Sequence, residues 1–319
     1  MDVRARTDEA GGVRALVVIY LKGICMGTAD AVPGVSGGTI ALIVGIYERL
    51  IGALTALSPR VLADVRRLHT QTGRRAVARR LVAMDVPFLV ALGLGVVTAV
   101  LVMSGIMHTA VTGYPVVTYA FFFGLIGASA VVLRHELWLT APRGVLAAVV
   151  GFALAFAVSG EATVAATDPT LPFVFFAGAL AVSAMLLPGV SGSFILVLLG
   201  LYEYMTEIPG QFFDLLLGAS IEGTTLVATG IVVTVFVTGA LIGLLTISHA
   251  VRYALTTHRR ATLTFLVALI IGALRVPVVR VADNVTGWTP GTAGAVLVAA
   301  AVGALLVGGL SYVTDDLAV

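Results

Sequence analysis

The sequence predicts an all-α, polytopic membrane protein built from two inverted-topology repeats. The first observation is composition, since 59% of the 319 residues are hydrophobic and 11% are charged, against roughly 25% charged in an ordinary soluble domain. The second is a series of ten apolar segments of about the length that a bilayer requires. The third is a five-residue motif that occurs twice in the chain.

Composition also excludes several classes of function. A mean hydropathy of +1.07 is too high for a soluble domain, whose surface must be polar. The 19 basic and 17 acidic residues nearly cancel, to +2, so we expect no nucleic-acid partner. Cys25 is the only cysteine and can form neither an intrachain disulfide nor a thiolate cluster. No HExxH or other metal-ligand pattern occurs, so we expect no metal, no cofactor and no catalytic residues.

The apolar segments set the order of the predicted spans. A lead-in at 1–12 comes first, lacks the short apolar region and cleavage site of a secretory signal, and is expected to be cytoplasmic. A short tail at 313–319 ends the chain. Between them lie the ten segments, at residues 13–32, 39–57, 86–104, 115–133, 144–160, 171–187, 190–206, 225–247, 262–279 and 292–312.

The arginines predict the orientation of these segments in a plasma membrane. Seven arginines lie in the connection 58–85, which should therefore be cytoplasmic. Arginines 134 and 143, and arginines 252, 259 and 260, indicate two more inside loops, whereas the stretches 161–170 and 207–222 are acidic and should be outside. The partly amphipathic segment 59–80 is expected on the inner leaflet, either to fix the topology or to gather anionic membrane lipids.

The repeated motif reveals two related halves. Pro33-Gly34-Val35-Ser36-Gly37 recurs 155 residues later as Pro188-Gly189-Val190-Ser191-Gly192, and the residues around Tyr47 and Tyr202 also match. The first repeat spans 13–160, with a broken or re-entrant pair at 13–57, and the second spans 171–312, with its pair at 171–206. Because each half holds five segments, an odd number, the second half must run upside down. Such inverted repeats are common among secondary transporters.

The motifs predict breaks in the helices and an anion site beside them. Proline removes a backbone donor and glycine opens a turn, so Pro33, Gly34, Pro188 and Gly189 should interrupt their helices. A helix N-terminus rich in small polar residues suits a phosphate. Close packing of helices is the alternative explanation for such residues. The candidate phosphate contacts are Ser36, Gly37, Gly38, Thr39, Ser191, Gly192 and Ser193.

Ionisable residues inside spans are candidates for coupling or gating, because they are costly in hydrocarbon. Asp30 precedes the first break and has Met185 at its repeat position, whereas Glu48 and Glu203 are repeat equivalents. Each of these two glutamates could carry the coupling ion or hold two helices together, whereas the lack of a repeat counterpart favours a function of Asp30 at one gate only. Arg49 follows Glu48 too closely to pair with it, since neighbours diverge by about 100° around a helix. Arg275 could reach a phosphate or extend to the interface.

The strings GTADAVPGVSGGTIALIVGIYE, from Gly27 to Glu48, and LLPGVSGSFILVLLGLYE, from Leu186 to Glu203, resemble the signature of a bacterial and archaeal membrane family. That family, the PopT family, is associated with polyprenyl-phosphate translocation. The resemblance implies a polyprenyl-phosphate lipid as substrate and recycling of that lipid carrier to the cytoplasmic leaflet. It also implies that the motif residues contact the phosphate. A proton or a sodium ion is the expected coupling ion, and the oligomeric state stays open.

Two other functions remain open at this point. Polyprenyl-pyrophosphate phosphatases also use inverted repeats and carry a PGxSRS-type motif, but Gly37 and Gly192 stand where that motif has its arginine. Without this arginine the motif lacks a fixed charge for a transferring phosphoryl group. A small-anion carrier or channel is the second alternative, because helix N-termini bind inorganic anions as well. A purely structural scaffold is the least economical explanation of paired broken helices.

Overall fold

The computed structural model describes residues 12–56, 70–161, 169–185, 191–219, 221 and 224–317. Most of these residues are helical, and within these ranges the one strand-like feature is an isolated bridge between Ile221 and Thr224. Six helices are long and apolar enough to cross a membrane. The predicted class is therefore confirmed, and the chain is an all-α polytopic membrane protein.

Six of the predicted segments fall on these long helices. Each is a continuous apolar run with few charges, and α8 and α14 are extended by a short helix at their C-terminal ends. The helices are α7 (Val86–Gly113), α8 (Pro115–Val132) with η1 (Leu133–Glu136), α9 (Pro142–Glu161), α13 (Leu226–Thr257), α14 (Arg259–Ala273) with α15 (Arg275–Asn284), and α16 (Pro290–Leu317).

The first two segments of each half are shorter or broken. The segment 39–57 forms α3 (Gly37–Ile43) and α4 (Tyr47–Ala56), which are bent by 118° relative to each other. Likewise, 190–206 falls on α11 (Gly192–Leu198) and α12 (Tyr202–Leu216). The opening segments of the two halves are α2 (Val13–Ala31) and the 15-residue α10 (Leu171–Met185).

The breaks inside these segments have the same backbone geometry in both halves. Gly45 and Gly200 adopt φ values of +71° and +70°, in the left-handed region that favours glycine. Gly45 N–H donates to Leu42 and the next N–H to Ala41, while the corresponding bonds at Gly200 go to Val197 and Leu196. This pair of bonds is the Schellman ending of a helix. The repeat of 155 residues therefore extends from sequence to local structure.

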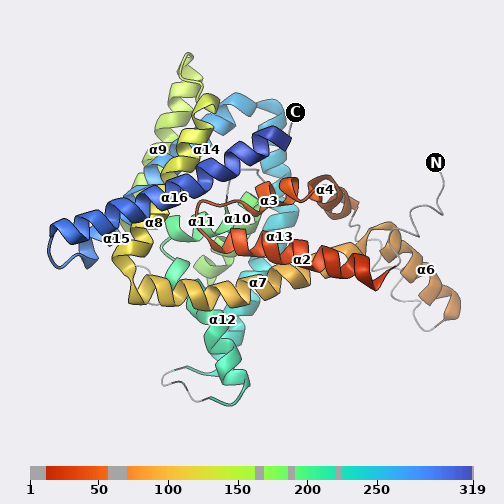
Figure 1. Ribbon diagram of the computed structural model, residues 1–319. Coiled ribbons are helices and arrows are strands. Elements are labelled where there is room, and N and C mark those ends of the chain that lie inside the picture. The colour runs from red at the N-terminus through yellow and green to blue at the C-terminus, as the bar shows by residue number, and fades with distance from the viewer. Residues whose placement is uncertain are drawn as a thin grey trace. The chain divides into compact units, whose positions relative to one another are not determined.

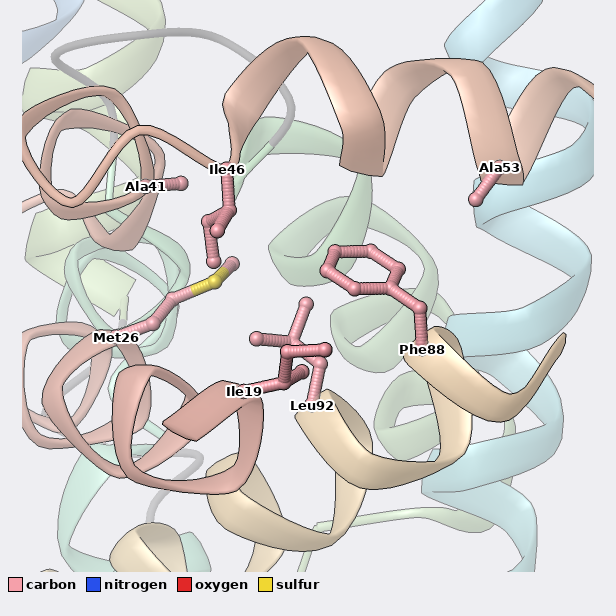
Figure 2. Close-up of a cluster of buried hydrophobic side chains, with 7 residues drawn as sticks. All are labelled: Ile19, Met26, Ala41, Ile46, Ala53, Phe88 and Leu92. Atoms are coloured by element: carbon pink, nitrogen blue, oxygen red, sulfur yellow. The ribbon is translucent and has the colours of Figure 1, made fainter. Parts of the chain in front are cut away.

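Contacts divide the chain into two compact units, one of residues 1–29 with 40–100 and one of residues 30–39 with 101–319. In the first unit α2 and α7 run parallel, because Gly23 lies against Leu92 and Gly27 lies against Val96. A cluster of seven buried side chains from α2, α7 and the α3–α4 segment forms its core (Figure 2). The helix α6 (Gln71–Ala83) also belongs here, whereas residues 57–69 of the predicted amphipathic segment lie outside the described ranges.

In the second unit, helices from the two halves pack reciprocally. The fourth span of the first half, α8, packs along α16, the fifth span of the second half (Figure 1). In the same way α14, the fourth span of the second half, packs along α9. Such an exchange is expected of two structurally related halves. The inversion of one half relative to the other stays a prediction, as do the boundaries of the two repeats.

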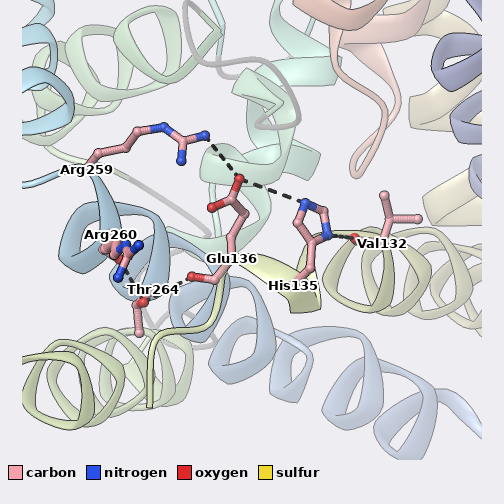
Figure 3. A network of polar contacts seen from close by, with 6 residues as sticks. All are labelled: Val132, His135, Glu136, Arg259, Arg260 and Thr264. Carbon is pink, nitrogen blue, oxygen red and sulfur yellow. Dashed lines mark hydrogen bonds and ion pairs between the residues drawn. The ribbon is translucent and has the colours of Figure 1, made fainter. Parts of the chain in front are cut away.

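Two connections that the arginines predict to lie on the same side of the membrane are in contact with each other. Glu136 of η1 pairs with Arg259 at 3.1 Å, and the Thr264 hydroxyl donates to the carbonyl oxygen of Arg260 at 2.7 Å (Figure 3). The Thr264 hydroxyl also lies 3.2 Å from the carbonyl oxygen of Glu136. The loop after α8 and the start of α14 therefore share one end of the second unit, in agreement with the distribution of arginines.

Candidate functional site

The first break in the chain is buried against α8. Between α2 and α3, Gly34 adopts a φ of +91°, and a Cβ there would press on the main chain of Leu125 and Ile126 at 3.1 Å. The Ser129 hydroxyl lies 2.9 Å from the carbonyl oxygen of Gly34. Pro33 is fully buried. The backbone N–H and C=O groups of an irregular segment inside a membrane need hydrogen bonds from protein or water. Here Ser129 of α8 supplies one of these hydrogen bonds.

Asp30 caps the start of α3 with its side chain. Its Oδ1 accepts a 2.8 Å hydrogen bond from the Gly37 N–H, and the residue is only 6% exposed. A Cβ at position 37 would overlap the Asp30 carboxylate, so only glycine fits there. The second oxygen, Oδ2, is buried without a hydrogen-bond partner among the described residues. One half of this carboxylate is thus held, and the other half is available to a ligand or a proton.

The Ser36 hydroxyl lies in the same break and is also unsatisfied. Ser36 is 4% exposed, and its Oγ has no partner in the part of the chain that the structure describes. Gly38 is buried and Thr39 is half-buried beside it. A buried hydroxyl without a hydrogen bond costs roughly 1–3 kcal/mol, so Ser36 and Asp30 together indicate a place where a further polar group belongs.

The second motif differs from the first in its polar contacts. Ser191 is 2% exposed and its Oγ lies 2.7 Å from the Oγ of Ser193. Gly192 packs on Met185, as Gly37 packs on Asp30, because a Cβ at 192 would lie 2.9 Å from the Met185 side chain. A thioether cannot accept the hydrogen bond as a carboxylate does, and no side chain among the described residues caps α11. Pro188 and Gly189 lie outside the described residues.

Tyr202 joins the regions of the two motifs. Its hydroxyl donates a 2.7 Å hydrogen bond to the carbonyl oxygen of Ala31, the last residue of α2. Tyr202 is 3% exposed and its ring makes an edge contact with Phe122 of α8. The residue after the second Schellman turn therefore supports the end of the helix that leads into the first motif.

Glu203 is held by two partners that the sequence did not suggest. The Tyr119 hydroxyl donates a 2.5 Å hydrogen bond to its Oε1, and Arg280 Nη1 lies 3.6 Å from the same oxygen. These residues, with Ser159, line a small cavity of about 10 Å³. Arg280 was not among the predicted site residues because it lies beyond the predicted span 262–279, at the polar end of α15. The sequence signal that could have indicated it is its position five residues after Arg275.

The other ionisable candidates lie elsewhere. Arg275 donates to the Phe156 carbonyl oxygen at 2.7 Å and lies over the Phe156 ring, which is a structural role. Glu48 is exposed, and Arg49 pairs with Asp85 through bonds of 2.5 and 2.9 Å. The predicted coupling and gating residues therefore belong to different units: Asp30 and Glu203 lie in the second unit, and Glu48 and Arg49 lie in the first. Across the described ranges, no three His, Cys, Asp or Glu side chains are grouped as metal ligands.

Comparison with known proteins decides the family. A sequence model of the undecaprenyl phosphate translocase-like proteins matches residues 26–310, nearly the whole chain. The chain belongs to this family. The matched residues include both motifs, the Gly45 and Gly200 turns, five of the six long helices in full and α16 as far as residue 310.

Two relatives of the chain carry the same name. The polyprenyl-phosphate transporter of Vibrio cholerae is 34% identical over 266 residues, which cover 83% of this chain and 78% of the relative. The polyprenyl-phosphate transporter of Staphylococcus aureus is 28% identical over 281 residues, or 84% of this chain and 88% of that protein. No solved structure matches the chain. The resemblance seen in the motifs is therefore confirmed over most of the sequence.

Proposed function

We propose that this protein carries a polyprenyl phosphate of the undecaprenyl type across the plasma membrane, with its N-terminus in the cytoplasm, and thereby recycles the lipid carrier. The substrate class follows the names of the two relatives. A phosphate head cannot cross about 30 Å of hydrocarbon unaided, whereas an isoprenoid tail can remain in the lipid. The protein then has to provide a polar path across the membrane for the phosphate head only, because the tail stays in the lipid.

The phosphate is held between the two motifs near the middle of the membrane in this proposal. The observation that carries it is a pair of buried polar atoms, Asp30 Oδ2 and Ser36 Oγ, that have no hydrogen-bond partner among the described residues. A phosphate oxygen would accept from the Ser36 hydroxyl and from a protonated Asp30. The hydroxyls of Ser191 and Ser193, which now bond to each other, are the corresponding donors of the second motif.

A proton is the coupling ion that this arrangement favours over sodium. An ionised Asp30 repels a phosphate, whereas a protonated Asp30 offers it a hydrogen-bond donor at Oδ2 while Oδ1 still caps Gly37. A sodium ion requires several oxygen ligands, but the described break offers only two buried side-chain oxygens without a hydrogen-bond partner. Because Met185 stands at the equivalent position of the second motif, one carboxylate serves the whole site.

The packing around Gly37 supports a carrier rather than a phosphatase. Any side chain at position 37 would meet the Asp30 carboxylate, and any side chain at 192 would meet Met185. An arginine, which the phosphatase motif requires there, has no room in either half. The fixed positive charge that would stabilise a transferring phosphoryl group is therefore absent from these two positions.

Reconstitution tests the proposal directly. Purified protein is placed in liposomes with labelled undecaprenyl phosphate, and a membrane-impermeant phosphatase is added outside. Without translocation, about half of the lipid is protected, whereas an active carrier exposes nearly all of it. We expect the external phosphatase to reach nearly all of the labelled lipid with the native protein, and about half of it with Ser36→Leu or Ser191→Leu.

A matched control separates loss of the site from loss of the fold. Ser104 is 4% exposed, like Ser36, but its hydroxyl bonds within its own helix to the Leu101 carbonyl oxygen. Ser104→Leu introduces the same bulk into a buried position and should leave translocation unchanged once the protein is folded. Native-like translocation by both Ser36→Leu and Ser191→Leu contradicts the site. Phosphate release from undecaprenyl pyrophosphate by the purified native protein contradicts the assignment as a carrier.

A further inference from the structure

A basic groove opens in the first compact unit, and its lining residues come from the chain on either side of the first motif. It has a volume of about 540 Å³, which is in the usual range of small-molecule sites. One wall is the N-terminal half of α2, and the other is the turn from Gly45 to Arg49. The residues that line it are Gly12, Arg14, Ala15, Val18, Ile19, Lys22, Gly45, Ile46 and Arg49.

The groove carries two positive charges that no described carboxylate compensates. Arg14 and Lys22 lie eight residues apart on α2, and therefore on one face of the helix, with Val18 between them. The Lys22 ammonium donates one 2.6 Å hydrogen bond to the Val44 carbonyl oxygen, and this leaves two of its three donors for another acceptor. The third cation, Arg49, is neutralised by Asp85.

The second half of the chain provides an internal comparison. Its turn at Gly200 has the same φ and the same hydrogen bonds as the turn at Gly45. Yet the positions equivalent to Arg14, Lys22 and Arg49 are occupied by Pro169, Ala177 and Tyr204. The turn therefore forms without these cations. The need to end α3 therefore does not explain the three cations. A function that only the first half performs does explain them.

We propose that this groove binds the phosphate head of a polyprenyl phosphate before or after its passage through the membrane. A phosphomonoester carries a charge of about −1.5 to −2 near neutral pH, which matches the two uncompensated cations. The groove follows the lead-in predicted to be cytoplasmic, so it lies where the lipid would be released or loaded. The proposal shares its substrate with the proposed function, but binding at the groove does not depend on transport.

The apolar wall of the groove suits the beginning of an isoprenoid tail. Val18 is 45% exposed, whereas Ile19 and Ile46 are buried members of the core cluster (Figure 2). All three side chains line the groove. A phosphate ion occupies a small part of 540 Å³. The remaining space adjoins these apolar side chains, so a lipid phosphate fits better than inorganic phosphate.

The chain's single cysteine allows a direct test. Cys25 is exposed and lies three residues after Lys22 on α2, so an environment-sensitive fluorophore attached there reports on this part of the first unit. The full-length labelled protein, in nanodiscs of neutral phosphatidylcholine, is titrated with undecaprenyl phosphate. The titration is repeated in a Ser36→Leu background, in which the proposed central site is blocked and any remaining signal comes from the groove.

We expect saturable binding that survives Ser36→Leu and weakens at least 10-fold in Arg14→Gln with Lys22→Met. Lys22→Arg should bind like the native protein, and Arg134→Gln, which removes an exposed arginine of the second unit, is the matched control. Arg14 is exposed, so Arg14→Gln alone should weaken binding without affecting the fold.

Three results overturn the proposal. They are native-strength binding by the Arg14→Gln, Lys22→Met variant, equal binding of undecaprenol, which lacks the phosphate, and equal binding of phosphatidylglycerol or inorganic phosphate at the same concentration. If the native protein binds at the groove but moves no lipid in liposomes, the proposed function fails while this site stands.

Discussion

The hydroxyl of Tyr202 donates a 2.7 Å hydrogen bond to the carbonyl oxygen of Ala31, across 171 positions of sequence. This bond ties the helix after the second motif to the helix before the first. Both residues belong to the second compact unit, and both adjoin a break in the helices. The two motifs, found first as a repeat in the sequence, are therefore mechanically connected in the fold.

Removal of this bond should weaken the fold. Tyr202→Phe leaves the Ala31 carbonyl oxygen without its buried donor, at a cost of roughly 1–3 kcal/mol. Thermal unfolding of the purified protein in detergent measures the effect. Tyr114→Phe, at a tyrosine that is 71% exposed, is the control and should unfold at the native temperature. Equal unfolding temperatures for the two variants would show that the bond contributes nothing.

The contact between Asp30 and Gly37 predicts a non-additive pair of substitutions. Gly37→Ala forces a methyl group into the carboxylate and should destabilise the protein by about 1–3 kcal/mol. In the double variant Asp30→Ala, Gly37→Ala the clash is gone, so unfolding should occur at a higher temperature than in Gly37→Ala alone. Gly93→Ala, where a Cβ meets nothing within 4 Å, is the control. A double variant less stable than either single variant contradicts the geometry.

Asp30→Asn should uncouple translocation from the proton gradient. Asparagine keeps an oxygen to accept from Gly37 N–H and replaces the ionisable oxygen by a permanent donor. We expect native translocation in liposomes to respond to an imposed pH difference and Asp30→Asn translocation to proceed at a rate independent of it. A native protein that ignores the gradient removes proton coupling from the mechanism, whatever the variant does.

The two repeat-related glutamates should respond differently to the same change. Glu203→Ala strands the Tyr119 hydroxyl and the Arg280 guanidinium, and should cost about 1–3 kcal/mol. Glu48→Ala, at an exposed side chain, should cost under about 0.5 kcal/mol. Chemical denaturation in mixed micelles compares them. A double-variant cycle of Glu203→Ala with Arg280→Ala then measures their coupling, which a purely independent role would leave at zero.

Sequence reasoning predicted the membrane class and the long spans well because these depend on local composition. A run such as 115–133 is apolar throughout, and only a helix satisfies its backbone in a bilayer. It also found the motif glycines, because their repetition at a fixed spacing is visible without a structure. The family followed from the same strings.

The contacts within the site could not be predicted in the same way. Tyr119 and Arg280 reach Glu203 from helices distant in sequence, and no periodicity indicates such a meeting. Each half also has a second helix break, at Gly45 and at Gly200, that the sequence did not predict. A single glycine in an apolar run is common in membrane helices and therefore gives no signal. Its left-handed conformation becomes evident only when the helix is seen to end there.

The close approach of Gly37 to Asp30 limits how this chain can change in evolution. A larger residue at position 37, including the arginine of the phosphatase motif, is accommodated only after the carboxylate at position 30 has been lost. Loss of the carboxylate first would remove the cap of α3 and the proposed proton site. Conversion of a carrier of this kind into a hydrolase therefore requires at least two substitutions, and each of them alone is expected to impair the protein.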